Sequence, residues 1–148
     1  DWFRINVATP LVGSEMHRIC EEHAYFKEDP LLGNYKKAVV ETEDFTAEFI
    51  QKTSYLMNIE LNFVHNANMR SGRYDVALQG FHNVLKAKPD HPLAHYYAAV
   101  CHRCMGREDE AEACLGLALR YAHGSAFWQE ILDRFEIPLL TAAREVES

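Results

Sequence analysis

"SGRYDVALQGFHNVLKAKPDHPLAHYYAAVCHRCMGREDEAEACLGLAL", residues 71–119, decides the fold because residues at its beginning return at its end. A glycine, an alanine and a leucine each return 34 positions later: Gly72 as Gly106, Ala77 as Ala111, and Leu85 as Leu119. A fixed period of this length is typical of helical repeats, in which each copy is a pair of antiparallel helices. The alternative is a helical hairpin that matches the period by chance.

The repeated residues have physical reasons to recur. Gly72 and Gly106 lie between two apolar-periodic runs, where a tight turn between helices needs a residue that tolerates positive φ. Ala77 and Ala111 fall one turn into the second helix of each pair, where a larger side chain would hold the paired helices apart. Pro89 ends that helix in the first copy, because its ring removes a donor and disfavours helical geometry at the preceding residue.

The stretch over residues 58–122 resembles the tetratricopeptide repeat, whose pattern A-x3-F…P is present as Ala77, Phe81 and Pro89. One departure is the aromatic residue of the first helix, which is Leu61 in the first copy and His95 in the second. The resemblance implies a non-catalytic module that binds proteins or peptides.

The expected fold is mainly all-α, with antiparallel helix hairpins and a capping helix. A helical repeat domain is predicted over residues 46–148, with repeats at about 58–91 and 92–125 and the capping helix at about 125–136. A small α/β extension over residues 1–45 is predicted to precede it.

The extension is expected to hold one or two short strands. Residues 2–8, "WFRINVA", are β-branched and aromatic and are typical of a strand, and residues 38–42 are a second candidate. Ser14 is an N-cap candidate for a short helix between them. A long helix capped by Thr46 is then expected to continue without a break to Met69.

The loop "PLVGSE" (residues 10–15), with "KAVVETEDFTAEF" (residues 37–49), resembles the end of the catalytic barrel in cobalamin-binding radical S-adenosylmethionine proteins. The similarity covers about residues 1–50. Val12 stands where the family has proline, and the family's cluster-binding CxxxCxxC is absent. The resemblance implies a C-terminal part of an enzyme whose S-adenosylmethionine, iron-sulfur cluster and cobalamin are bound upstream. In the chain itself, no catalytic, cofactor-binding or metal-binding residue is expected.

Composition excludes several classes of function. The net charge of −7 argues against nucleic acid, which needs a basic stripe. No apolar run approaches the roughly 20 residues that span a bilayer, so no membrane is expected. The four cysteines, which lack the framework of a small secreted domain, favour a reducing, cytoplasmic setting.

Cys101 and Cys104, with histidines nearby, could suggest a metal site. Structural zinc takes four ligands that converge from two elements, whereas this pair lies at i and i+3 inside a predicted helix. Packing as small apolar residues is the preferred interpretation, and metal binding is the alternative.

A groove is predicted on the face lined by the first helix of each repeat. By register, its residues are Ile59, Asn62, Asn66 and Met69 in the first copy, and Leu93, Tyr96, Val100 and Arg103 in the second. This mixed aromatic, aliphatic and amide lining fits a helix or an extended segment, including one from the same polypeptide. Asn66 matches the carboxylate clamp found in some such repeats, but the clamp's lysine is Asn62 here, which argues against binding a charged peptide terminus.

Two functions follow from these observations. The first is a protein-interaction module at the C-terminus of a radical S-adenosylmethionine enzyme, and the alternative is a free-standing adaptor with an α/β cap. The apolar N-terminal strand is also expected to drive self-association, since its backbone groups need a pairing partner.

Overall fold

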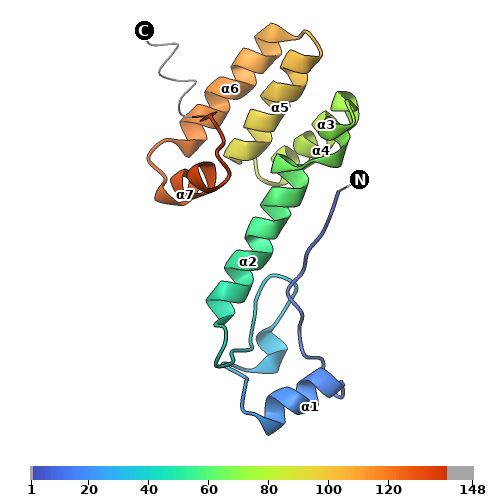
Figure 1. Cartoon of the computed structure of the whole chain (residues 1–148), viewed down its shortest axis with the longest axis vertical. Coiled ribbons are helices and arrows are strands. Elements are labelled where there is room, and N and C mark those ends of the chain that lie inside the picture. The colour runs from blue at the N-terminus through green and yellow to red at the C-terminus, as the bar shows by residue number, and fades with distance from the viewer. Residues whose placement is uncertain (1, 140–148) are drawn as a thin grey trace. The chain divides into compact units, whose positions relative to one another are not determined.

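The computed structural model describes residues 2–139 (Figure 1). Its elements are α1 (Glu15–Glu22), the 3-10 turn η1 (Pro30–Leu32), α2 (Ala47–Ile59), the π-helical turn η2 (Glu60–Val64), α3 (Ala67–Arg70), α4 (Tyr74–Ala87), α5 (Pro92–Cys104), α6 (Glu108–Ala122) and α7 (Ala126–Arg134). The mainly all-α expectation is confirmed. The chain folds as two compact units, one of Phe3–Ile59 and one that joins Trp2 to the described residues from Glu60 onwards.

The prediction of short strands near the N-terminus was wrong. Within residues 2–139 the β-pairing is confined to an isolated antiparallel bridge between Phe26 and Val40. The segment of residues 2–8 is irregular, because a helix side chain takes the place of a neighbouring strand. Asn58 Nδ2 donates to the carbonyl oxygen of Ile5 at 2.8 Å, and the Ile5 amide donates to Asn58 Oδ1 at 3.1 Å.

The unit Phe3–Ile59 is held by two small apolar clusters. One joins Val7, Ala38 and Ala47, with Ile50 packed against it, and the other joins Cys20, Val39 and Val40 with Tyr25 and Phe26. The predicted cap of α1 is confirmed, since Ser14 Oγ accepts from the amide of His17 at 3.2 Å. Much of this unit is loop, and side-chain hydrogen bonds help to hold the loop in place.

The prediction of an uninterrupted helix from Thr46 to Met69 was also wrong. After α2 the helix widens, and the amide of His65 donates to the carbonyl of Glu60, five residues back, at 2.7 Å. Asn66 then starts α3 as its N-cap, because its Oδ1 accepts from the amides two and three residues later at 3.0 and 3.1 Å. Asparagine competes in this way with the helix backbone, so it favours a break over continuation.

The second unit contains the paired helices, in which α5 packs between α4 and α6 (Figure 1). Gly72 and Gly106 adopt φ of 73° and 72°, as the turns between antiparallel helices require. Ala77 and Ala111 are 1% and 0% exposed, so both are packed inside the repeat unit. The period therefore marks turn positions and buried positions.

Enlarging either contact alanine is expected to separate the helices. Ala77→Leu and Ala111→Leu should each lower the free energy of unfolding by about 1–3 kcal/mol, because a packed site cannot accept three more carbons without strain. Ala113→Leu is the matched control, since residue 113 is exposed on the same helix as Ala111. Urea midpoints at constant m-value measure the change. Wild-type midpoints in both buried variants would contradict the assigned register.

Helix α7 closes the described part of the repeat unit. Its N-cap is Ser125, whose Oγ accepts from the Trp128 amide at 3.3 Å. Trp128, Ile131 and Leu132 are buried along one side of α7. Trp128 lies 5.1 Å from the ring of His91, the N-cap of α5, so α7 packs near the start of that helix.

Candidate functional site

Helix α5 offers a partner one narrow face. Nine of its residues are buried: Pro92, Leu93, Ala94, His95, Tyr97, Ala98, Ala99, Cys101 and His102. Tyr96 and Val100 stay half-buried and Arg103 is exposed. These three lie at i, i+4 and i+7, so they form one line along the helix, here termed the α5 stripe.

The structure divides the eight predicted groove residues into two sets. Four are buried within the chain: Ile59, Asn62, Asn66 and Leu93. The other four are accessible: Met69, Tyr96, Val100 and Arg103. Ile59 belongs to the unit Phe3–Ile59 and the rest belong to the repeat unit. A binding role for the accessible four stays a prediction.

The α5 stripe combines an aromatic ring, an aliphatic side chain and a cation. Burial raises the pKa of the Tyr96 phenol, and the nearby charge of Arg103 opposes that shift. The Tyr96 ring packs edge-on against Tyr97, with centroids 5.0 Å apart. Arg103 Nε lies 3.5 Å from Glu108 Oε2 in an exposed pair, which contributes little and can exchange for a partner's carboxylate.

Trp2 is a residue whose role sequence reasoning missed. Its ring lies 5.5 Å from Phe63 and 6.1 Å from Phe81, both in edge-on geometry. The indole also covers Gly80, where an added Cβ would lie 3.1 Å from two of its ring carbons. An isolated glycine inside an otherwise helical pattern was the signal, because such a residue can mark the close approach of another group.

His91 joins the two repeats and α7. Its imidazole stacks on Phe63 with centroids 5.1 Å apart and an interplanar angle of 7°, and it lies 5.1 Å from the Trp128 ring. Its Nδ1 accepts from the amide of Ala94 at 3.2 Å, so His91 is also the N-cap of α5. Burial lowers the pKa of His91 to about 4. The ring is therefore neutral at neutral pH.

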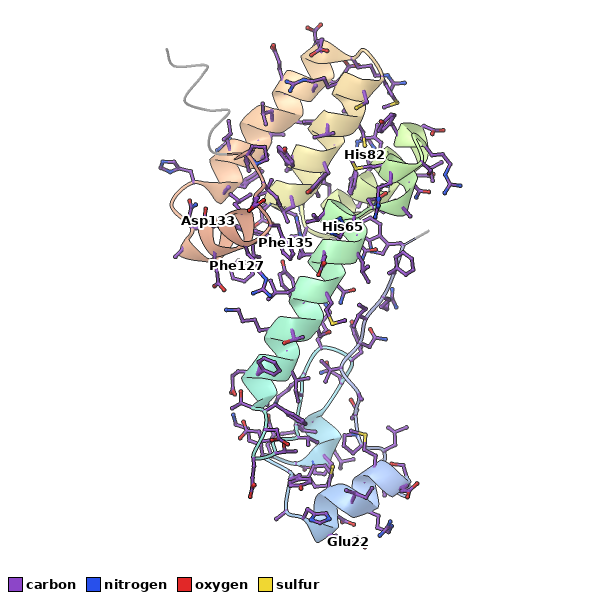
Figure 2. All side chains as sticks on the ribbon, viewed as in Figure 1. Glu22, His65, His82, Phe127, Asp133 and Phe135 are labelled. Carbon is purple, nitrogen blue, oxygen red and sulfur yellow. The ribbon has the colours of Figure 1, made fainter. Side chains whose placement is uncertain are left out.

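His95 and His65 have different environments. His95 is buried and stacks on Tyr121 with centroids 5.5 Å apart, which agrees with a packing role. His65 follows η2 and is exposed, with Nε2 3.8 Å from Glu60 Oε1 (Figure 2). Of the two, only His95 is packed in the interior.

The cysteine pair is divided between core and surface. Cys101 is fully buried, and burial raises the pKa of its thiol to about 12, whereas Cys104 is exposed. Within residues 2–139, no three His, Cys, Asp or Glu side chains converge so that they could hold a metal ion. In the same residues, no helix is both long and apolar enough to cross a membrane.

Antiparallel hairpins at a fixed period, with small residues at the contacts and a covering helix at the end, define a helical-repeat protein. Residues 68–132 match the tetratricopeptide repeat family, so the predicted repeat is confirmed in this segment. Repeats of this family generally bind proteins or peptides. The match leaves out residues 1–50, where the resemblance to radical S-adenosylmethionine proteins stays a prediction. Comparison with curated proteins gave no match, and neither did comparison with solved structures.

Proposed function

We propose that the repeat unit binds a protein segment through the α5 stripe. The observation that carries this proposal is the burial of nine α5 residues, which leaves a continuous line of Tyr96, Val100 and Arg103 accessible. An aromatic ring and a valine suit an apolar side chain of the partner, and the guanidinium suits a carboxylate beside it. The bound segment is an extended or helical stretch of the same polypeptide, upstream of this chain.

We further propose that the chain is the C-terminal part of a cobalamin-dependent radical S-adenosylmethionine enzyme. Its S-adenosylmethionine, iron-sulfur cluster and cobalamin would be held upstream, and its setting is cytoplasmic. Support comes from the loop of residues 10–15, which carries the resemblance and in which three residues have clear structural roles. Pro10 is buried, Gly13 adopts φ of 86°, and Ser14 caps α1. Sequencing the gene upstream tests this: a CxxxCxxC motif within a few hundred residues is expected, and its absence would remove the enzyme.

The second candidate function is a free-standing adaptor, and one observation favours it. The extended N-terminal segment is bonded within its own unit, because Ile5 pairs with Asn58 and the Val7 amide donates to the Tyr35 carbonyl at 3.0 Å. This segment therefore needs no barrel strand on that edge. Self-association through its opposite edge belongs to both candidates and would appear in light scattering as a concentration-dependent mass.

Loss of the α5 stripe is expected to weaken binding of the upstream part of the polypeptide. Tyr96→Ala and Arg103→Glu should each raise Kd roughly tenfold or more, since aromatic and arginine anchors dominate such surfaces. Arg120→Glu, the same charge reversal on the exposed side of α6, is the control and should keep the wild-type Kd. Calorimetric titration of the upstream part into this chain gives the values. Equal affinity for all variants would overturn the role of the stripe.

A further inference from the structure

The unit Phe3–Ile59 contains a cleft that the repeat function does not use. Its volume is about 520 Å³, and it is lined by Arg4, Ile5, Asn6, Tyr35, Lys36, Gln51, Ser54, Tyr55 and Asn58. All nine residues belong to this unit. The volume falls within the range of clefts that bind small molecules, roughly 300–1,000 Å³.

The walls of the cleft are fixed to one another by hydrogen bonds. Helix α2 contributes Gln51, Ser54 and Asn58, which share one face by their spacing. Ser54 Oγ donates to the Ile5 carbonyl at 3.2 Å, in addition to the two Asn58 bonds. Gln51 Oε1 accepts from the amide of Ala38 at 3.0 Å. The cleft is therefore built before any ligand arrives, which keeps the entropic cost of binding low.

The charged residues of the lining are both cations, Arg4 and Lys36. Neither forms an ion pair with any residue in the described range 2–139. Other cations of the same unit are paired: Lys37 lies 2.7 Å from Glu28, and Lys27 lies 2.7 Å from a glutamate oxygen. In a chain of net charge −7, two cations without carboxylates on one cleft concentrate positive potential there.

Two tyrosines contribute aromatic surface to the lining. Tyr35 comes from the loop before α2 and Tyr55 comes from α2, and both residues line the cleft. Lys36 Nζ lies 5.4 Å from the centroid of the Tyr35 ring, which places a cation beside one of these rings. A flat ligand body can stack on such rings while its anionic end meets the cation.

We propose that this cleft binds a small anion, a carboxylate or a phosphate ester, carried on a flat apolar body. Arg4 and Lys36 bind the oxyanion, Tyr35 and Tyr55 contact the body, and Asn6 supplies a polar group at the rim. This site is independent of the α5 stripe and of any upstream enzyme.

The test is a nitrogen-edited NMR titration of the whole chain with phenyl phosphate and, separately, with benzoate. At least one probe should give saturable shifts at the amides of residues 4–6, 35–36 and 51–58. Arg4→Gln and Lys36→Gln should each weaken that binding about tenfold or more, since each removes a charge-assisted hydrogen bond. Lys86→Gln removes the same charge at an exposed position of α4, and this variant should bind the probe as tightly as the wild type does.

The outcomes separate clearly. Saturation by benzoate alone assigns a carboxylate ligand, and saturation by phenyl phosphate alone assigns a phosphate ester. Either supports the site if benzyl alcohol, which has the ring without the anion, shifts nothing there. The proposal is overturned if neither probe saturates by about 10 mM, or if both cleft variants bind as tightly as Lys86→Gln. Circular dichroism of each variant establishes that the fold is kept.

Discussion

Phe81→Ala is expected to lower the free energy of unfolding of the repeat unit by about 3–5 kcal/mol. Phe81 is 0% exposed. Its ring lies 5.6 Å from Phe63, 5.9 Å from Tyr97 and 6.1 Å from Trp2, so it contacts residues of both repeats and Trp2. Truncation leaves a cavity that rigid aromatic neighbours cannot fill, so the transfer and cavity costs add.

The matched control for this variant is Phe127→Ala, which removes the same atoms from a side chain that is 51% exposed on α7 (Figure 2). Its effect should be well under half of that at Phe81, because little cavity is created. Urea unfolding of both variants, with the m-value checked for constancy, gives the comparison. Similar losses at the two positions would show that the aromatic cluster is not the centre of the unit.

The second large effect is a loss of stability in acid that originates at His91. Its folded pKa is about 4, against an ordinary value of 6.5. Below pH 6.5 the unfolded chain binds a proton at this residue that the folded chain does not accept until about pH 4. Stability is therefore full above pH 6.5 and falls through that window, by roughly 3 kcal/mol in total from this one group.

His91→Asn isolates this contribution, because asparagine keeps an N-cap acceptor for α5 and removes the titrating ring. The variant is expected to be less stable at pH 7, yet its stability should change less between pH 6.5 and 4.5. Burial also lowers the pKa of His102, so a smaller slope of the same sign should remain. Proton NMR of the His91 ring in the folded wild type gives its midpoint directly, and a midpoint near 6.5 would refute the argument.

The repeat could be predicted because its rules are local. A positive φ at Gly72 and Gly106, and a small side chain at Ala77 and Ala111, are demands that each turn and contact makes on its own residues. The same locality explains why the caps at Ser14 and Thr46 were found, since each hydroxyl accepts from an amide three residues later.

The wrong predictions, the N-terminal strand and the long helix, arise where side chains form the hydrogen bonds of backbone groups. Residues 2–8 have the composition of a strand, yet Ile5 bonds to Asn58, 53 positions away, and no period reports such a pair. The break after η2 depends on Asn66, whose side chain bonds to α3 and, through Nδ2, to the Asn62 carbonyl at 2.7 Å. Asn66, which the register assigned to the groove, is buried and caps α3.

The accessible residues of the candidate site were easier to predict in the second copy of the repeat than in the first. Tyr96, Val100 and Arg103 follow helical spacing on an intact helix, so register alone placed them on one accessible line. The first copy lacks an intact first helix, since η2 and the short α3 take its place. Register assumes an uninterrupted helix, and its assignments there fell on buried side chains such as Asn62.

Trp2 makes the repeat unit discontinuous in sequence, which turns the other unit into an insertion. Phe3–Ile59 begins directly after Trp2 and ends directly before Glu60, so both of its ends are anchored in the same folded body. Trp2 is joined to the rest of the repeat unit through this folded unit, so a change that unfolds Phe3–Ile59 is also expected to loosen Trp2 from Phe63 and Phe81.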